Sequence, residues 1–144
     1  MKIQIKTKVD QDYLSVKNGF NEKLFNQLSP PFPPVKLIRF DGSEKGDIVS
    51  LELNFLLFRQ IWKSEIIDDK TTDTEFYFID VGVDLPFFLK KWRHKHRIMK
   101  AENGSVIRDE IEYSGPFRLM TLLLYPALYL QFAYRIRIYK RIFA

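Results

Sequence analysis

Both histidines of this 144-residue chain lie in one short segment, residues 92–97, which reads WRHKHR. Side chains alternate between two faces along a β-strand, so Trp92, His94 and His96 are expected to share one face. Imidazole groups titrate near neutral pH and can accept or donate a proton. This face is therefore a candidate site for ligand contact or acid–base chemistry.

A second alternating segment, residues 106–113, would pair with the histidine strand across a turn at residues 102–105. In that pairing, Asp109 and Tyr113 point to the same side as the two imidazoles. A face with two imidazoles, a carboxylate and a phenol is costly to bury unless these groups bond one another or a ligand. Asp109 and Tyr113 are therefore further candidate site residues.

Three interpretations of this polar group are open. The side chains could contact a ligand or transfer a proton, or they could form a structural network in which Asp109 holds one imidazole and Tyr113 bonds the backbone. Two histidines at i and i+2 with a carboxylate across the ladder are also a known metal ligand set. Because another clear ligand is missing nearby and the chain has no cysteine, no metal site is predicted. No glycine-rich phosphate loop is present, and no cofactor is expected.

The opposite face of the same strand pair is charged. Arg93, Lys95 and Arg97 would lie opposite Glu110 and Glu112, as is typical of a solvent-exposed face with cross-strand charge pairs. The acidic residues neutralise much of this basic stripe, and no aromatic platform for base stacking interleaves with it. Binding to nucleic acid is therefore not expected.

Apolar and polar residues alternate with a period of two along most of the chain, which predicts strands. Two short helices are predicted between the first and second strands, from an aspartate cap at position 10 or 12 to about Lys17, and from a cap at Asn21 to Leu28. The predicted strands cover residues 2–9, 35–40, 49–55, 60–68, 74–83, 92–99 and 106–113.

The stretch from Phe117 to Tyr134 is almost continuously apolar and approaches the length that crosses a membrane. It contains Pro126 and several polar residues, and it follows an amphipathic sheet that needs a cover. A long helix buried along one face of the sheet explains it better. Tyr125 and Tyr129 are one turn apart and would present their hydroxyls on the same side.

This order of elements predicts an α+β helix-grip fold, in which a curved seven-stranded antiparallel sheet and a long C-terminal helix enclose a cavity. Residues 1–144 would form a single domain, since no linker or repeat interrupts the pattern. An aromatic-rich interior with a few polar groups is typical of a small-molecule pocket.

A set of short motifs follows the order of these elements. Its positions are Phe78 and Asp80, Pro86 and Phe87, Trp92, His94 and His96, Asp109, Ile111 and Tyr113, and Pro116 and Phe117. In these motifs the sequence resembles the START/SRPBCC (birch-pollen-allergen-like) superfamily, in a bacterial branch described as cyclase/dehydrase-like or cell-division-inhibitor-like. Departures from the pattern of that branch at Leu85, Ile98 and Arg118 affect the shape of the pocket mouth. The resemblance implies a cavity for lipids, quinones or polyketides, but no particular reaction.

Composition adds an expected location. The N-terminus alternates and lacks the apolar core of a signal peptide, and the absence of cysteine fits a reducing compartment, so a cytoplasmic protein is expected. The net charge is +5, and no acidic residue follows Ser114. A transient contact with a membrane surface beside the pocket mouth is a further expectation.

Two functions fit these observations. The first is a carrier or sensor that holds a hydrophobic small molecule. Its apolar wall would consist of Phe76, Phe78, Trp92, Leu123, Tyr125 and Tyr129, and its polar contacts would be His94, His96, Asp109 and Tyr113. The alternative is a cyclase/dehydratase-type enzyme, in which a histidine moves a proton while Tyr113 polarises a carbonyl. The sequence leaves the choice between them open.

Overall fold

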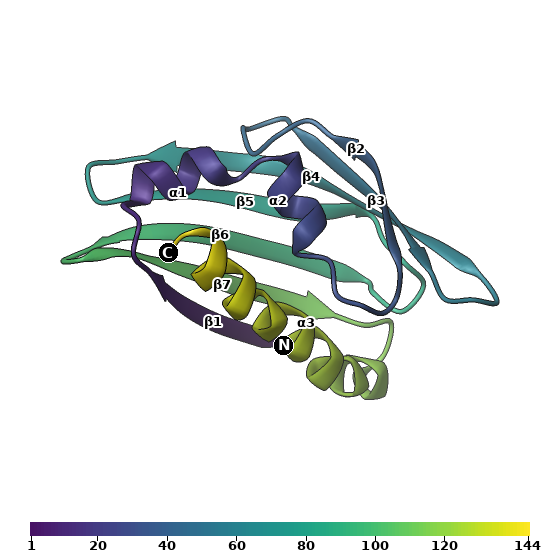
Figure 1. The fold of residues 1–144 in the computed structure, drawn as a ribbon. Helices are drawn as coiled ribbons and strands as arrows, with labels where there is room; N and C mark the ends of the chain where they lie inside the picture. The colour runs from purple at the N-terminus through teal and green to yellow at the C-terminus, as the bar shows by residue number, and fades with distance from the viewer.

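The computed structural model describes residues 1–144 as a seven-stranded antiparallel sheet and three helices (Figure 1). The strands are β1 (Lys2–Val9), β2 (Val35–Phe40), β3 (Ile48–Asn54), β4 (Arg59–Thr71), β5 (Glu75–Asp84), β6 (Lys91–Ala101) and β7 (Gly104–Ser114). The helices are α1 (Tyr13–Gly19), α2 (Glu22–Gln27) and α3 (Arg118–Ile142). The predicted helix-grip fold is confirmed, with β4 and α3 longer than expected.

The strand order is β1-β7-β6-β5-β4-β3-β2, so the first two strands in the sequence lie at opposite edges of the sheet. Helices α1 and α2 carry the chain from one edge to the other (Figure 1). Both start at a side-chain cap that satisfies free backbone N–H groups. Asp12 accepts from the amides of Leu14 and Ser15, and Asn21 accepts from that of Leu24.

Strands β6 and β7 pair in the register that the alternation predicts. Arg93 lies opposite Glu112, Lys95 opposite Glu110, and His96 opposite Asp109. The charged side chains are therefore on the outer face, and the histidines and Asp109 are buried on the inner face.

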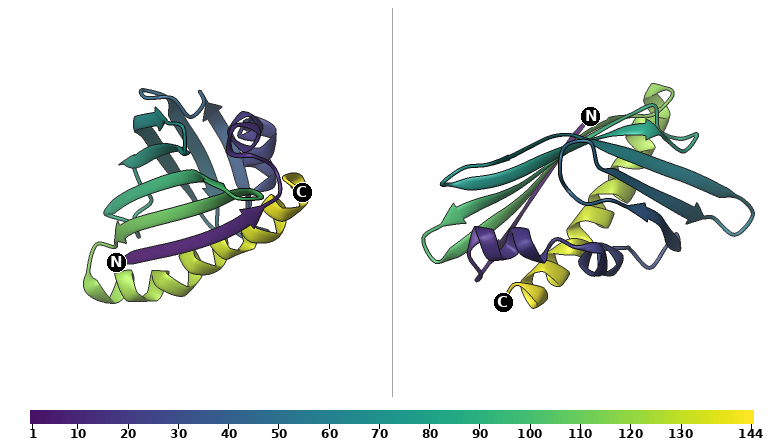
Figure 2. Two further views of the ribbon diagram at one scale, coloured as in Figure 1. Left: turned by 90° about the vertical axis from the view of Figure 1, so that its left-hand side faces the viewer. Right: turned by 90° about the horizontal axis from the view of Figure 1, so that it is seen from above.

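The sheet bends, and all three helices lie on its concave side (Figure 2). Two register shifts between β4 and β5 contribute to this bend, because a bulge increases local twist. Leu128 and Phe132 of α3 pack in one core cluster with Ile3 and Ile111 of the sheet. The end of α3 packs against α1 in a second core cluster. None of the helices combines the length and the apolar character that a membrane crossing requires.

Candidate functional site

A cavity of about 470 Å³ lies between the concave face of the sheet and the helices. Of its 33 lining residues, 21 are hydrophobic, so most of the wall offers no hydrogen-bonding group to a ligand. The lining includes Phe58 and Phe87, whose exposed fractions are 45% and 62%. The cavity therefore reaches the surface of the protein at these two rings.

Aromatic rings surround this mouth. Phe55 stacks on Phe58 with their ring centroids 5.2 Å apart, and Phe58 lies 5.8 Å from Phe87. Between Phe55 and Phe58, the turn joining β3 to β4 exposes Leu56 and Leu57, at 80% and 94% of their surface. Two large aliphatic side chains thus project into solvent beside the opening.

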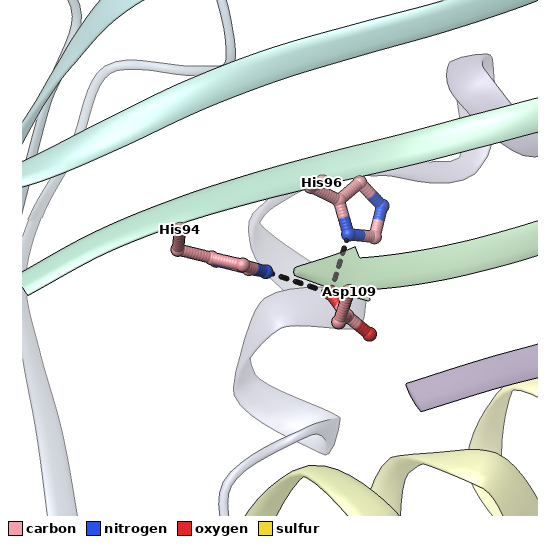
Figure 3. A group of neighbouring side chains, drawn as sticks. All are labelled: His94, His96 and Asp109. Atoms are coloured by element: carbon pink, nitrogen blue, oxygen red, sulfur yellow. Dashed lines mark hydrogen bonds and ion pairs between the residues drawn. The ribbon is translucent and has the colours of Figure 1, made fainter. Parts of the chain in front are cut away.

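A continuous hydrogen-bonded network of buried side chains crosses the inner face of the sheet. The indole Nε1–H of Trp92 donates to Asp80 Oδ1 at 2.9 Å, and Asp80 Oδ2 lies 3.0 Å from His94 Nδ1. On the other side of this imidazole, His94 Nε2 lies 2.7 Å from Asp109 Oδ1 (Figure 3). The same oxygen lies 2.8 Å from His96 Nδ1. Two carboxylates and two imidazoles therefore alternate along one chain.

His94 carries a positive charge at neutral pH. Burial acts to lower its pKa, but the carboxylates of Asp80 and Asp109 outweigh burial and raise the pKa to about 9. Both ring nitrogens then donate, one to each carboxylate. Burial acts to raise the pKa of Asp109, but His96 and His94 together hold it well below its usual range. Asp109 is thus a buried carboxylate.

His96 is the neutral member of the network. Burial lowers its pKa, although the negative charge of Asp109 acts in the opposite direction. Because Nδ1–H donates to Asp109, Nε2 carries a lone pair. This atom is buried without a hydrogen-bond partner and lies on the far side of the ring from Asp109 (Figure 3). The ring lines the cavity between Phe20 and Phe78, with centroids 4.5 and 5.0 Å away.

The same cluster has the composition of a metal site. One ligand atom from each of His94, His96 and Asp109 lies within 4.8 Å of the others. However, both nitrogens of His94 are engaged by carboxylates, and a protonated imidazole has no lone pair to give to a metal ion. The geometry therefore favours a hydrogen-bonded network over a coordination site.

The structure brings together five of the eight site residues expected from the sequence. Phe78, Trp92, His94 and His96 line the cavity, and Asp109 joins the two histidines.

Tyr113 is separated from this group. Its hydroxyl donates to the carbonyl oxygen of Thr121 at 2.8 Å and does not line the cavity. This is the backbone bond of the structural interpretation.

Tyr125 and Tyr129 lie elsewhere. Their rings stack on each other with centroids 6.1 Å apart. The two residues are 38% and 43% exposed, and neither lines the cavity. Helix α3 turns another face inward, because residues spaced by three or four share one side of a helix. The α3 residues that line the cavity are Met120, Leu124, Ala127, Leu128, Gln131, Phe132 and Arg135.

Two charged residues that line the cavity, Asp80 and Arg135, were absent from the sequence-based set. Asp80 was noted only as part of a motif, although its alternation with Phe78 and its pairing with His94 place it inside. Arg135 lies in the segment after Ser114 that has no acidic residue, and because apolar residues occur on more than one side of this helix, the sequence does not indicate that Arg135 faces the cavity.

Comparison with known proteins gives similarity in fold without similarity in sequence. No known protein family matches the sequence, and no curated protein does. An aromatase/cyclase of Streptomyces sp. R1128 superposes with a TM-score of 0.67 at 10% identity, covering 95% of this chain and 89% of that one. Norcoclaurine synthase of Thalictrum flavum, solved with dopamine and hydroxybenzaldehyde, has a TM-score of 0.65 at 13% identity, over 94% and 83% of the two chains.

Ara h 8.0201 superposes over 93% of each chain with a TM-score of 0.58 at 11% identity. These structures share the curved sheet and long C-terminal helix found here. The chain therefore has the same helix-grip fold as these solved structures.

Proposed function

We propose that this protein binds a hydrophobic small molecule, of lipid, quinone or polyketide-like character, in the cavity between the sheet and α3. The observation that carries the proposal is the 470 Å³ cavity, whose lining is mainly apolar and includes one buried polar network. Pockets of this size and composition are typical of small-molecule sites. Norcoclaurine synthase, which shares this fold, was solved in complex with dopamine and hydroxybenzaldehyde, and this supports a small-molecule ligand.

Within this proposal the ligand contacts Phe78, Trp92, His94 and His96, which form one wall of the cavity. Asp109 orients both imidazoles without touching the ligand. Tyr113 anchors the start of α3 through Thr121.

Filling the cavity is expected to abolish binding. Ser64 lies in β4 with its side chain toward the cavity, so a Ser64→Phe ring would occupy ligand space. Titration with the neutral fluorescent probe N-phenylnaphthylamine should show at least a tenfold weaker affinity in this variant, since about 1.4 kcal/mol of lost contact is tenfold. Ile67→Phe places the same ring on an exposed position of the same strand and should bind like the wild type. An equal loss of probe affinity in both variants would exclude the cavity as the binding site.

A cyclase/dehydratase-type activity is the second candidate, and His96 is the observation that favours it. An imidazole whose Nδ1–H is held by a carboxylate and whose Nε2 is free resembles a general base. His94 has no free nitrogen and Tyr113 is turned away, so the roles expected of them in this mechanism have no geometric support.

The enzymatic candidate predicts that the protein accelerates ring closure of an acyclic triketone to a pyrone, with loss of one water. His96→Gln should remove at least a hundredfold of any acceleration, as is typical for a general base. Ultraviolet absorbance of the pyrone follows the reaction. A wild-type rate equal to the uncatalysed rate would argue against this candidate and leave the binding proposal intact.

Membrane contact at the mouth is part of the same proposal, because an apolar ligand partitions into a lipid phase in preference to water. Leu57, exposed at 94% beside the opening, can insert into a bilayer. Leu57→Asp should reduce co-sedimentation with phosphatidylcholine–phosphatidylserine vesicles by roughly tenfold. Leu14→Asp, an exposed leucine on α1, is the matched control and should sediment like the wild type. Unchanged binding of the Leu57 variant would remove this part of the proposal.

A further inference from the structure

Three polar atoms without hydrogen-bond partners belong to side chains grouped around α3 and β6. They are His96 Nε2, Arg135 Nε and Tyr139 Oη, and all three are buried. Arg135 and Tyr139 are one turn apart on α3 and so lie on the same side of that helix. The rings of His96 and Tyr139 are 6.4 Å apart, and Phe20 contacts both. Unsatisfied buried groups are rare and call for an explanation.

The guanidinium of Arg135 is the unusual member of this group. It lines the cavity and lies over the ring of Phe132, with Cζ 4.3 Å from the ring centroid. None of the ion pairs in the structure includes Arg135. The buried carboxylates Asp80 and Asp109 are engaged by His94 and His96 instead. The Arg135 guanidinium thus lies at the cavity wall without an ion-pair partner.

His96 supplies the complementary function. Its Nε2 accepts a hydrogen bond, whereas Arg135 Nε can only donate one. Burial lowers the pKa of His96 and the charge of Arg135 acts in the same direction, so the imidazole stays neutral and keeps its lone pair. A ligand group that satisfies both residues must donate a hydrogen bond to His96 Nε2 and accept one from Arg135 Nε–H. An acidic hydroxyl does both, whereas an ester or ether has no proton to give and an amine cation is repelled by Arg135.

We propose that the cavity selects apolar molecules that end in an acidic hydroxyl, a carboxylic acid or a phenol, and that Arg135 and His96 bind this end. The O–H group of a phenol, or of a carboxylic acid that takes up one proton from solvent on binding, donates to His96 Nε2, and the same head group accepts from Arg135 Nε–H. Burial raises the pKa of Tyr139 and the neighbouring Arg135 guanidinium acts to lower it, so the Tyr139 hydroxyl stays protonated and is a further donor beside Arg135. This inference rests on the proposed function, because it names the chemistry of the ligand for the same cavity.

The test compares three probes in the intact protein: dodecanoic acid, its methyl ester and a nonylphenol, each displacing N-phenylnaphthylamine. The wild type should bind at least one of the two acids about tenfold or more tightly than the ester, since hydrogen bonds to charged groups are among the strongest in proteins. Arg135→Met should lose this preference while binding the ester within about twofold of the wild type. Arg137→Met, at an exposed position on the same helix, should retain the preference.

The outcomes separate the inference from the proposed function. Wild-type protein that binds the ester as tightly as both acids would overturn the acid selectivity and leave apolar binding in place. Failure to bind any of the three probes would count against both. The wild-type comparison decides the matter even if Arg135→Met does not fold. Preference for the fatty acid over the phenol, or the reverse, identifies which acid the cavity takes.

Discussion

Replacing Asp109 with alanine is expected to lower the free energy of unfolding by about 3–5 kcal/mol, the usual cost of removing one partner from a buried ion pair. One oxygen of this carboxylate serves both His94 and His96, and the side chain is only 2% exposed. Without it, a buried imidazolium keeps a single carboxylate partner and the Nδ1–H of His96 keeps none. Urea denaturation at constant pH measures the change.

Glu112 is the matched control for this substitution. It lies on the same strand with its side chain 53% exposed, in a 3.8 Å ion pair with Lys2. Because exposed ion pairs contribute little, Glu112→Ala should change stability by less than about 1 kcal/mol. If Asp109→Ala were as mild as Glu112→Ala, the network would not be a stabilising feature of the fold.

Stability is expected to peak near pH 6.5 and to fall on both sides of it, as far as the buried network is concerned. The pKa of His94 rises from 6.5 in the unfolded chain to about 9 in the folded one. Its contribution is therefore complete below pH 6.5 and is lost as the pH rises toward 9. A difference of that size corresponds to roughly 3 kcal/mol. Urea denaturation at a series of pH values measures this loss.

On the acid side the signs are reversed. The folded pKa of His96 lies below its usual value, so under acid conditions the unfolded chain takes up a proton that the folded protein does not, and stability falls below pH 6.5. Asp109 adds to this loss of stability when the pH falls below 3.8, the ordinary pKa of its carboxyl, because its pKa is lower in the folded protein. The variant His94→Gln should remove the alkaline loss while keeping the acid one. A wild-type protein equally stable at pH 6.5 and 9 would contradict the charge assignment of His94.

The strands and their pairing could be predicted because their physical cause is local. Alternation of period two runs through β1, β3, β6 and β7, and a one-residue slip would have moved the charged residues Arg93 and Lys95 into the core. The Asp12 and Asn21 caps likewise act within three residues of themselves. Local rules of this kind fix the order of elements, and the order of elements led to the helix-grip fold.

The inward face of α3 could not be predicted in the same way. The helix is apolar on more than one side, so its sequence contains no contrast that says which side packs against the sheet. Leu123 and Tyr125 were expected in the cavity wall and are 62% and 38% exposed, whereas Leu124 and Arg135 line the cavity. Packing of Leu128 and Phe132 against the sheet sets this rotation, and that depends on tertiary contacts.

Only part of the buried hydrogen-bonded network could be predicted, for a related reason. His94, His96 and Asp109 share a face on paired strands, so the alternation brought them together. Asp80 completes the network from β5, where Asp80 pairs with His94. That pairing depends on the register of β5 with β6, including where β5 begins after the turn, which the sequence left undetermined.

Native mass spectrometry of the freshly purified protein, followed by solvent extraction, is the most direct test of the central claim that the cavity holds a hydrophobic small molecule. We expect one apolar molecule per chain, released on denaturation and absent from the Ser64→Phe variant, whose cavity is filled. The same bound mass in Ser64→Phe, or no added mass in either protein even after incubation with dodecanoic acid and its methyl ester, would contradict the claim.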